Sequence, residues 1–369
     1  MTNPLVQLGA LGQSPWLDFI TRDLLTSGEL QRMIEQDGLR GMTTNPTIFE
    51  KAFGESDTYD HDIRELAEQG LNPGRIFEAI AVADVQKACD IFKPVFEATH
   101  GQDGYVSLEV APEFAYDAEA TVREARRLWA SVGRNNTMIK IPGTAEGLQA
   151  IEKVVSLGIN VNVTLLFSVE RYERVVGAYF AGLQSRLVRN MPLDRLASVA
   201  SFFVSRVDGK IDPLLDKIGT DEAKALRGSI AIANAQAAYE RFEAAFRGSD
   251  WRVLARKGAR PQRPLWASTS TKDPQYTDTH YVEPLIAQNT VNTLPPDTFK
   301  AYRDHGDPQI RIPERIPDAR EKLEKLKGLG IDLAAVTEGL EKEGVSKFQQ
   351  SFTQLLAVVD QKAAQLQRA

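Results

Sequence analysis

The sequence contains little sulfur and little imidazole, with one cysteine, Cys89, and four histidines among 369 residues. A single cysteine excludes an internal disulfide framework and is typical of the reducing cytoplasm, where we expect this protein to act. Cys89 lies in a helical apolar pattern with Val85 and Phe92, which indicates a packed thiol rather than a nucleophile. The histidines are scattered without the paired spacing of a metal-binding motif, so we predict no metal site.

Several other signals are also absent. No apolar run approaches the roughly 20 residues that span a bilayer, and residues 1–12 lack the basic region and apolar core of a signal peptide. Neither GxGxxG nor GxxxxGK followed by Ser or Thr occurs, so nothing favours a nucleotide-binding loop. The 44 lysines and arginines are outnumbered by 50 aspartates and glutamates, and no basic block stands out. We therefore expect neither a membrane nor a nucleic acid as a partner.

The composition that remains is typical of a soluble globular enzyme, with 43% hydrophobic and 25% charged residues. A chain of this length could form two average domains or one large α/β barrel. Strand-like and helix-like segments alternate about eight times, which is the signature of a parallel barrel inside a ring of helices. We predict an α/β fold, a single (β/α)8 TIM barrel domain over residues 1–369.

The predicted elements can be placed along the chain. Strands are expected at residues 16–21, 39–43, 105–110, 137–141, 159–165, 197–205, 265–269 and, more weakly, 290–293. Helical patterns between them include residues 76–96, 118–131, 144–156, 169–187 and 221–246. Two regions exceed a minimal barrel. The charged residues 50–72 predict extra helices after the second strand, and residues 314–369 predict a C-terminal helical extension whose apolar face packs on the barrel.

Lys140 is the most informative side chain of the sequence. It lies in the apolar segment TMIKIP, where Ile139 and Ile141 point to one side of a strand and Met138 and Lys140 to the other. An ammonium group in such a place is costly unless it is paired, neutral or chemically used. A buried lysine is the usual route to a Schiff base with a sugar carbonyl. An edge strand with Lys140 in water is the alternative interpretation.

Alternation on other strands supports a buried site. In INVNVT (159–164) and YVSLEV (105–110) the apolar and polar residues separate by parity, and Asp18 opposes Leu17 and Phe19. In a barrel covered by helices the apolar set must face the helices, so the polar set points inward. Polar side chains near the carboxyl ends of barrel strands indicate an active site. We therefore predict that the strands bring together Asp18, Glu109, Lys140, Asn162 and Thr164.

At this point two segments resemble the signatures of the transaldolases. One is GMTTNPTIF (41–49), and the other runs from Met138 to Phe167 and contains Lys140 and NVTLLF. The resemblance covers about Trp16 to Lys272, and the carboxyl-terminal stretch is similar to the longer bacterial branch. It implies a class I aldolase-type barrel that forms a Schiff base on the fourth strand, where Lys140 stands. It implies no metal and no other cofactor.

The resemblance also implies residue roles. Asp18 matches the proton-transfer aspartate of the family, and Glu109 and Thr164 match the pair that positions a catalytic water. The remaining matches are substrate-binding residues, with hydroxyl contacts from Asn45 and Asn162 and phosphate contacts from Ser201 and Arg206. The shorter members carry a second phosphate-binding arginine just after the seventh strand, and this chain has none there. Lys272, or the nearby Ser and Thr hydroxyls, could replace it, since lysine binds phosphate as a point charge.

The implied activity is transfer of a dihydroxyacetone unit from sedoheptulose 7-phosphate to glyceraldehyde 3-phosphate in the non-oxidative pentose phosphate pathway. The expected partners are sugar phosphates, and the chain is expected to be a monomer or a homodimer. Phe203 shares strand parity with Ser201 and is expected to face the barrel interior, where packing is its simplest role. In the related fructose 6-phosphate aldolases a tyrosine stands at this position and a glutamine replaces the glutamate. Phe203 and Glu109 together therefore favour transfer over free aldol cleavage.

Three alternatives stay open at this point. An aldolase on the same scaffold would release free dihydroxyacetone without needing an acceptor aldehyde. A non-catalytic barrel that binds sugar phosphates would keep Arg206 and lose the lysine chemistry, although the combination of Lys140, Glu109 and Asp18 argues against it. A metal-dependent aldolase is disfavoured by the sparse histidines.

Overall fold

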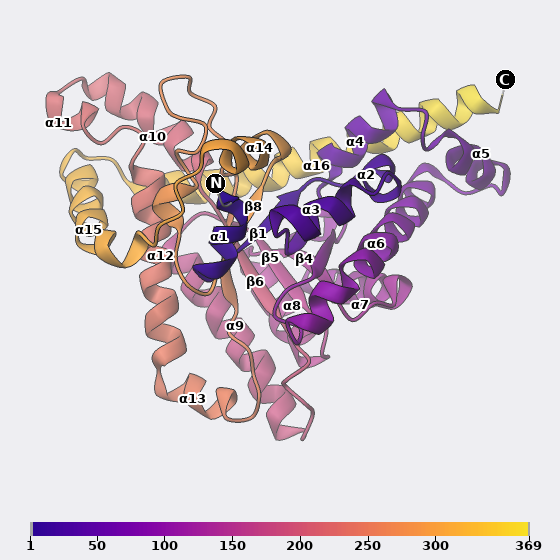
Figure 1. Ribbon diagram of the computed structural model, residues 1–369, viewed down its shortest axis with the longest axis horizontal. Helices are drawn as coiled ribbons and strands as arrows, with labels where there is room; N and C mark the ends of the chain where they lie inside the picture. The colour runs from indigo at the N-terminus through magenta and orange to yellow at the C-terminus, as the bar shows by residue number, and fades with distance from the viewer. Residues whose placement is uncertain (1–2, 368–369) are drawn as a thin grey trace.

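The computed structural model describes residues 3–367 and contains a closed barrel of eight parallel strands in sequential order, β1 to β8 (Figure 1). The strands are β1 Gln13–Asp18, β2 Gly41–Thr43, β3 Tyr105–Glu109, β4 Thr137–Pro142, β5 Val161–Leu166, β6 Ser198–Phe203, β7 Arg263–Ala267 and β8 Thr290–Leu294. The predicted fold class is therefore confirmed. β1 pairs with β8 and closes the barrel, with Trp16 beside Thr293 and Leu17 beside Leu294.

The barrel is surrounded by helices that connect successive strands. Their bounds are α1 Pro4–Ala10, α2 Arg22–Thr26, α3 Glu29–Asp37, α4 Pro46–Glu55, α5 Asp60–Glu68, α6 Pro73–Ala98, α7 Ala118–Val132, α8 Ala145–Ser156, α9 Val169–Val188, α10 Ser205–Ile218, α11 Asp221–Lys224, α12 Ile230–Arg247, α13 Ser249–Ala255, α14 Pro296–His305, α15 Ile312–Gly328 and α16 Leu333–Leu366. Short 3-10 turns lie at Pro112–Phe114 and Glu283–Leu285. Within residues 3–367, no helix is long and apolar enough to cross a bilayer.

Strand parity separates two apolar clusters, one facing the helices, as the sequence predicts, and one inside the barrel. Val161 and Val163 of β5 belong to the large cluster that the strands form with the surrounding helices. Met138 of β4 belongs to a small cluster inside the barrel, formed with residues of the same inward parity, Trp16, Tyr105, Ala197, Val199, Leu265, Ala267 and Val291. This inner cluster fills the lower and middle barrel. The inward positions nearer the carboxyl ends of β1 to β5 are largely polar.

Several predicted elements differ in their bounds from the observed ones, two of them most clearly. The helical pattern at 221–246 is broken, because α11 ends at Lys224 and α12 begins at Ile230. Gly228 lies between them with a φ of +64°, a conformation that favours glycine, and the ring of Tyr276 packs where a side chain would stand. The first strand begins at Gln13 rather than at residue 16 and ends at Asp18, because the Thr21 hydroxyl caps α2.

The extra helices lie where they were predicted, after β2 and at the carboxyl terminus. In Figure 1 the 34-residue α16 passes across the barrel and reaches α4 and α5 at its far end. It packs on α4, α5, α6, α10 and β5. Near its end Lys362 donates to the backbone oxygens of Phe53 (2.8 Å) and Ser56 and pairs with Asp60 (2.6 Å). These contacts attach α16 to the segment that joins α4 to α5.

The amino-terminal end of the barrel is closed by a buried ion pair. Arg263, at the start of β7, pairs with Asp103 at 2.7 Å, and the two side chains are 7% and 10% exposed. The Arg263 guanidinium also donates to Ser14 Oγ and to the backbone oxygen of Gln102, both at 2.8 Å. Ser14 in turn donates to the second oxygen of Asp103 at 2.9 Å. Both carboxylate oxygens of Asp103 are therefore hydrogen-bonded.

Candidate active site

A cavity of about 850 Å³ lies at the carboxyl ends of the strands. This is the end of a TIM barrel at which the loops after the strands form active sites. Nine of the ten predicted site residues line it, namely Asp18, Asn45, Glu109, Lys140, Thr164, Ser201, Phe203, Arg206 and Lys272. Asn162 is not among the lining residues. The structure therefore brings together side chains from β1, β3, β4, β5 and β6, from the first turn of α10 and from the loops after β2 and β7.

Lys140 is buried and paired. It stands on β4 beside Glu109 of β3, its partner in the strand register. The Lys140 Nζ lies 2.6 Å from Glu109 Oε1, and the two side chains are 8% and 10% exposed. Nζ also donates to the backbone oxygen of Thr44 at 3.0 Å. The alternative of an edge strand with Lys140 in water is wrong, because β4 lies between β3 and β5 and the side chain points inward.

Burial changes the acidity of the carboxyl group beside Lys140. It raises the pKa of Glu109 to about 7, and the ammonium of Lys140, by attraction and hydrogen bonding, limits the rise. The negative charge of Asp18 adds a small further rise in the pKa of Glu109. A carboxyl group with a pKa near 7 exchanges protons readily at neutral pH, as a general acid or base must.

Two polar atoms near this pair have no hydrogen-bond partner in the described part of the chain. They are Glu109 Oε2 and Thr164 Oγ1, and both are buried. Buried polar atoms in native proteins are nearly always hydrogen-bonded, to protein or to ordered water. Both residues line the cavity. Unsatisfied atoms at this position indicate a place for a ligand or a water, as expected for a site rather than for a packed core.

Asp18 lies at the end of β1, at the edge of the cavity. Its Oδ1 accepts a hydrogen bond from Thr43 Oγ1 at 2.7 Å, and Thr43 shares a further hydrogen bond of 2.7 Å with Thr293 of β8. One carboxylate oxygen is thereby oriented by protein. Sequence reasoning missed Thr43 and Thr293. Both share the inward parity of Asp18, through the register of β1 with β2 and β8, and this parity could have identified them.

Asn162 lies in a hydrogen-bonded row below the cavity. Its Nδ2 donates to Ser107 Oγ at 3.0 Å, and its Oδ1 accepts from Ser201 Oγ at 2.7 Å. The side chain is fully buried. This arrangement orients Ser201, which does line the cavity. Direct contact of Asn162 with a substrate stays a prediction.

Asn45 has a structural role that the sequence pattern also explains. It is the N-cap of α4, and its Oδ1 accepts from the backbone N–H of Ile48 at 3.2 Å. An asparagine followed by proline at the first helical position is a common helix start. The cap uses the amide oxygen of Asn45. Its amide nitrogen has no hydrogen bond among the described contacts, and Asn45 lines the cavity.

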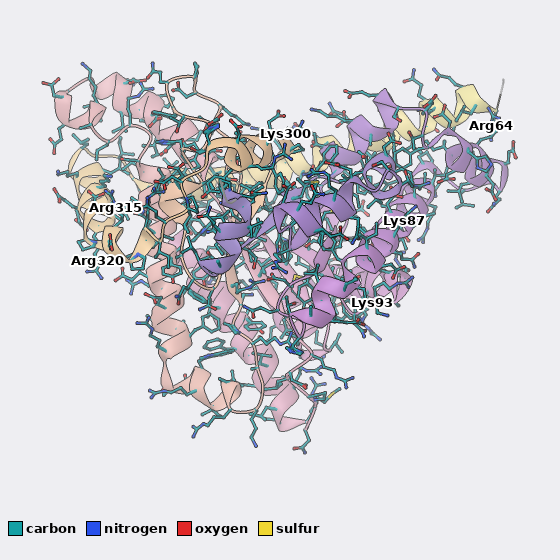
Figure 2. All side chains as sticks on the ribbon, in the orientation of Figure 1. Arg64, Lys87, Lys93, Lys300, Arg315 and Arg320 are labelled. Carbon is teal, nitrogen blue, oxygen red and sulfur yellow. The ribbon has the colours of Figure 1, made fainter. Side chains whose placement is uncertain are left out.

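Two cations near the carboxyl ends of β6 and β7, Arg206 and Lys272, have no carboxylate partner among residues 3–367. Arg206 lies in the first turn of α10, with its guanidinium carbon 5.1 Å from the ring centre of Phe203. Burial lowers the pKa of Arg206, and no ion pair or hydrogen bond of its guanidinium appears among the described contacts. Lys272 is exposed in the loop after β7 and is likewise without a described ion pair. By contrast, the cations labelled in Figure 2 lie scattered over the outer helices α5, α6, α14 and α15.

Part of the cavity wall comes from helices that sequence reasoning did not assign to the site. Lys51 and Glu55 of α4 contribute, as do Gly344, Lys347, Phe348 and Ser351 of α16. Thr47 and Ser351 join the two helices by a hydrogen bond of 3.1 Å. No motif in the sequence marks these residues, because their position depends on how α16 packs across the barrel.

Comparisons with known proteins agree with this geometry. The family model described as transaldolase/fructose-6-phosphate aldolase matches residues 15–359. A protein of Frankia alni named transaldolase is 50% identical over 364 residues, 98% of each chain. Proteins with the same name from Acidothermus cellulolyticus (51% over 362 residues, 97% of this chain and 96% of that one) and Trichodesmium erythraeum (46% over 376 residues, 99% of each) are similarly close.

Proposed function

The chain belongs to the transaldolase/fructose-6-phosphate aldolase family and is an enzyme of the transferase class, and we propose that it transfers a dihydroxyacetone unit through a Schiff base on Lys140. The proposed donor is sedoheptulose 7-phosphate and the proposed acceptor is glyceraldehyde 3-phosphate, which gives erythrose 4-phosphate and fructose 6-phosphate. The observation that carries the proposal is the buried pair of Lys140 and Glu109, open to a cavity at the carboxyl ends of the strands.

The first step is attack of the Lys140 amine on the ketose carbonyl carbon. The amine must be neutral to act as a nucleophile, so its proton has to leave. Glu109 lies 2.6 Å from Nζ and, with a pKa raised by burial, is a stronger base than an ordinary glutamate. Direct transfer of a proton from Nζ to Glu109 exchanges two buried charges for none. Burial, which raises the pKa of Glu109, favours uptake of that proton by Glu109.

The resulting carbinolamine must lose its hydroxyl as water to form the iminium ion. Glu109, now protonated, can deliver the required proton, directly or through a water held between Glu109 Oε2 and Thr164 Oγ1. Neither atom has a partner among the described residues, which supports this role. Proton transfers of this kind contribute about 10²–10⁴-fold to the rate.

Cleavage then needs a base for the hydroxyl group beyond the scissile bond. We assign this role to Asp18, whose Oδ1 is oriented by Thr43 while the carboxylate faces the cavity. As the hydroxyl proton moves to Asp18, the carbon–carbon bond breaks and its electrons move into the iminium, which becomes an enamine. The aldose product leaves, the enamine adds to the acceptor aldehyde, and hydrolysis of the new iminium frees Lys140.

The remaining lining residues are proposed to bind the sugar phosphate. Asn45 and Asn162 are assigned to hydroxyl groups of the sugar, and Asn162 also orients Ser201 by a hydrogen bond. Ser201, Arg206 and Lys272 are assigned to the phosphate, and Phe203 is proposed to support the Arg206 guanidinium through its ring. Glu109 and Phe203 stand where related aldolases carry glutamine and tyrosine, which supports transfer over release of free dihydroxyacetone.

A coupled assay tests this function. The protein is incubated with fructose 6-phosphate, with and without erythrose 4-phosphate, and formation of glyceraldehyde 3-phosphate is followed. The proposal predicts that product formation continues beyond the first turnover only when the acceptor is present. The Lys140→Met variant should form no product. Equal rates with and without acceptor would identify an aldolase instead. A non-catalytic sugar-phosphate-binding protein would give no product in either assay.

A further inference from the structure

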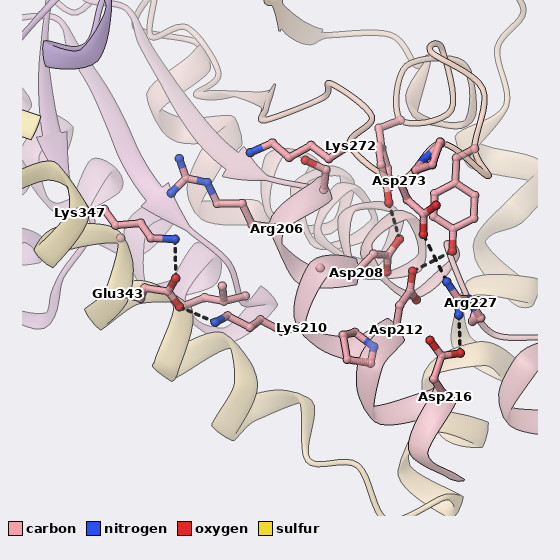
Figure 3. Close-up of a pocket in the computed structure, with 18 residues that line it drawn as sticks. Arg206, Asp208, Lys210, Asp212, Asp216, Arg227, Lys272, Asp273, Glu343 and Lys347 are labelled. Carbon is pink, nitrogen blue, oxygen red and sulfur yellow. Dashed lines mark hydrogen bonds and ion pairs between the residues drawn. The ribbon is translucent and has the colours of Figure 1, made fainter. Parts of the chain in front are cut away.

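A second cavity of about 630 Å³ adjoins the active-site cavity. The two cavities share four lining residues, Arg206, Lys272, Gly344 and Lys347, and three of these are cations. Two of the four, Gly344 and Lys347, belong to the C-terminal helix α16. Figure 3 shows Arg206 and Lys272 extending side by side, with Lys347 facing them from α16.

From this arrangement we propose that Lys347 is a phosphate ligand of the active site, so that α16 supplies a further cation beside Arg206 and Lys272. The inference rests on the proposed function for the identity of the phosphate ester. It goes beyond that function because it makes the C-terminal extension a part of the substrate site, with Lys347 as a determinant of specificity for phosphorylated sugars.

The charges at the junction of the cavities favour an anion. Glu343 pairs with both Lys210 (2.7 Å) and Lys347 (2.5 Å), and these hydrogen bonds lower the pKa of Glu343 to about 2. One carboxylate therefore serves two ammonium groups. With Arg206 and Lys272, these side chains carry a surplus of three positive charges. A sugar phosphate carries a charge of about −1.5 to −2 at neutral pH, which this surplus can neutralise.

The acidic residues of the second cavity other than Glu343 form their bonds with groups other than the three shared cations. Asp208 accepts hydrogen bonds from the backbone N–H of Ala231 (2.7 Å) and from Tyr281 (3.1 Å). Asp212 accepts from Gly228 N–H (3.1 Å) and from Tyr276 (2.7 Å). The two remaining carboxylates, Asp216 and Asp273, both pair with Arg227. The acidic side of this cavity is thus a bonded network separate from the three shared cations.

Close packing holds the relevant turn of α16 against the barrel. Gly344 lies against the end of β5, where a Cβ atom on Gly344 would stand 3.1 Å from Leu165 Cδ2. Leu165 itself has a φ of +59°, in the left-handed region, next to the register shift between Val163 and Leu166. Glycine at this position lets the helix approach the strand closely. Lys347, one turn further along α16, is thereby brought to the cavity edge.

Titration with inorganic phosphate tests the proposal independently of turnover. The variants are Lys347→Gln, which removes the charge, and Lys347→Arg, which keeps it. Lys342→Gln is the matched control, because Lys342 is on the same helix, is 69% exposed against 60% for Lys347, and pairs with Glu338 (2.6 Å) as Lys347 pairs with Glu343. Lys342 lines neither cavity.

We expect Lys347→Gln to raise the calorimetric Kd for inorganic phosphate about fivefold, the size of one partly screened charge contact. We expect the ratio of kcat/KM for fructose 6-phosphate to that for fructose to fall by a similar factor. Lys347→Arg should restore both values, and Lys342→Gln should match the wild type. Unchanged phosphate binding in Lys347→Gln would overturn the inference.

The two proposals can fail separately. A protein without transferase activity that still loses phosphate affinity on Lys347→Gln would retain the phosphate site and reject the proposed reaction. An active protein whose phosphate affinity and sugar preference do not respond to Lys347 would retain the reaction and reject the role of α16.

Discussion

The two ends of the barrel each hold a buried cation paired with a buried carboxylate, and they differ in how the pair is completed. At the amino-terminal end, Arg263 and Asp103 share hydrogen bonds with Ser14 and a backbone oxygen, and both oxygens of Asp103 are bonded. At the carboxyl-terminal end, Lys140 and Glu109 are as deeply buried, yet Glu109 Oε2 has no partner in the described residues.

We propose that this difference separates a structural pair from a reactive one. A guanidinium stays protonated and holds its partners in a fixed geometry, so the Arg263 pair closes the barrel without offering chemistry. An amine can lose its proton and form a covalent bond, and Glu109 can take up a proton near neutral pH. Burial alone therefore does not identify a functional charge. On our proposal, the functional pair is identified by the unpaired Glu109 Oε2 beside the cavity.

The largest expected effect is at the reactive end. Lys140→Met keeps the length of the side chain and removes the nucleophile, so we expect kcat/KM to fall by about 10⁴-fold or more. Steady-state kinetics with fructose 6-phosphate and erythrose 4-phosphate measures the loss, and circular dichroism checks the fold. Activity within tenfold of the wild type would contradict the assignment of Lys140.

Breaking the structural pair should have the opposite profile. Arg263→Met leaves Asp103 buried without its cation, and we expect the free energy of unfolding to fall by about 3–5 kcal/mol. Urea denaturation measures this loss. Turnover per folded molecule should match the wild type at temperatures where the variant stays folded. A specific loss of kcat with stability retained would show that the two ends are not functionally distinct.

Replacing one hydroxyl group at each end sharpens the same contrast. Ser14→Ala removes a bonded hydroxyl and leaves buried groups unsatisfied, so we expect a stability loss of about 1–3 kcal/mol and normal kcat. Thr164→Val removes a hydroxyl that has no partner within residues 3–367, so we expect little change in stability and a fall in kcat of about tenfold. Denaturation and kinetics on both variants give the two readouts. The account is wrong if the two variants exchange these profiles.

The smallest expected effect concerns the pH dependence of stability. The pKa of Glu109 is raised in the folded protein, so the folded state holds more protons than the unfolded state between the ordinary glutamate pKa and about 7. Stability contributed by this group is therefore present at low pH and is lost as the pH rises through that window. Glu109→Gln removes this contribution. The fall in urea midpoint from pH 5 to pH 8 should be smaller in the variant than in the wild type. An identical fall in the two proteins would contradict the raised pKa of Glu109.

Inward and outward positions of the barrel strands could be predicted from the sequence because alternation in a strand has a period of two. Parity alone placed Asp18, Glu109, Lys140 and Thr164 on the inner face, and the structure brings them to one cavity. The chemistry assigned to them came from the family resemblance. Parity could not distinguish Asn162, which lies below the cavity in contact with Ser107 and Ser201.

The structural pair and the α16 wall were not predicted, for physical reasons. The seventh strand was expected to begin at residue 265, so Arg263 fell outside it, although its parity with Leu265 points inward. Asp103 lies in the loop before β3, 160 residues away in the chain. The position of Lys347 depends on the packing of Gly344 against Leu165, and no local pattern reports a contact between such distant residues.

Trapping of the covalent intermediate tests the central claim most directly. The protein is incubated with fructose 6-phosphate, reduced with borohydride and digested, and the modified peptide is located by mass spectrometry. The account predicts a three-carbon adduct on Lys140 in the wild type and in the Arg263→Met variant, and none in Lys140→Met. No adduct, or an adduct on another lysine, would contradict it.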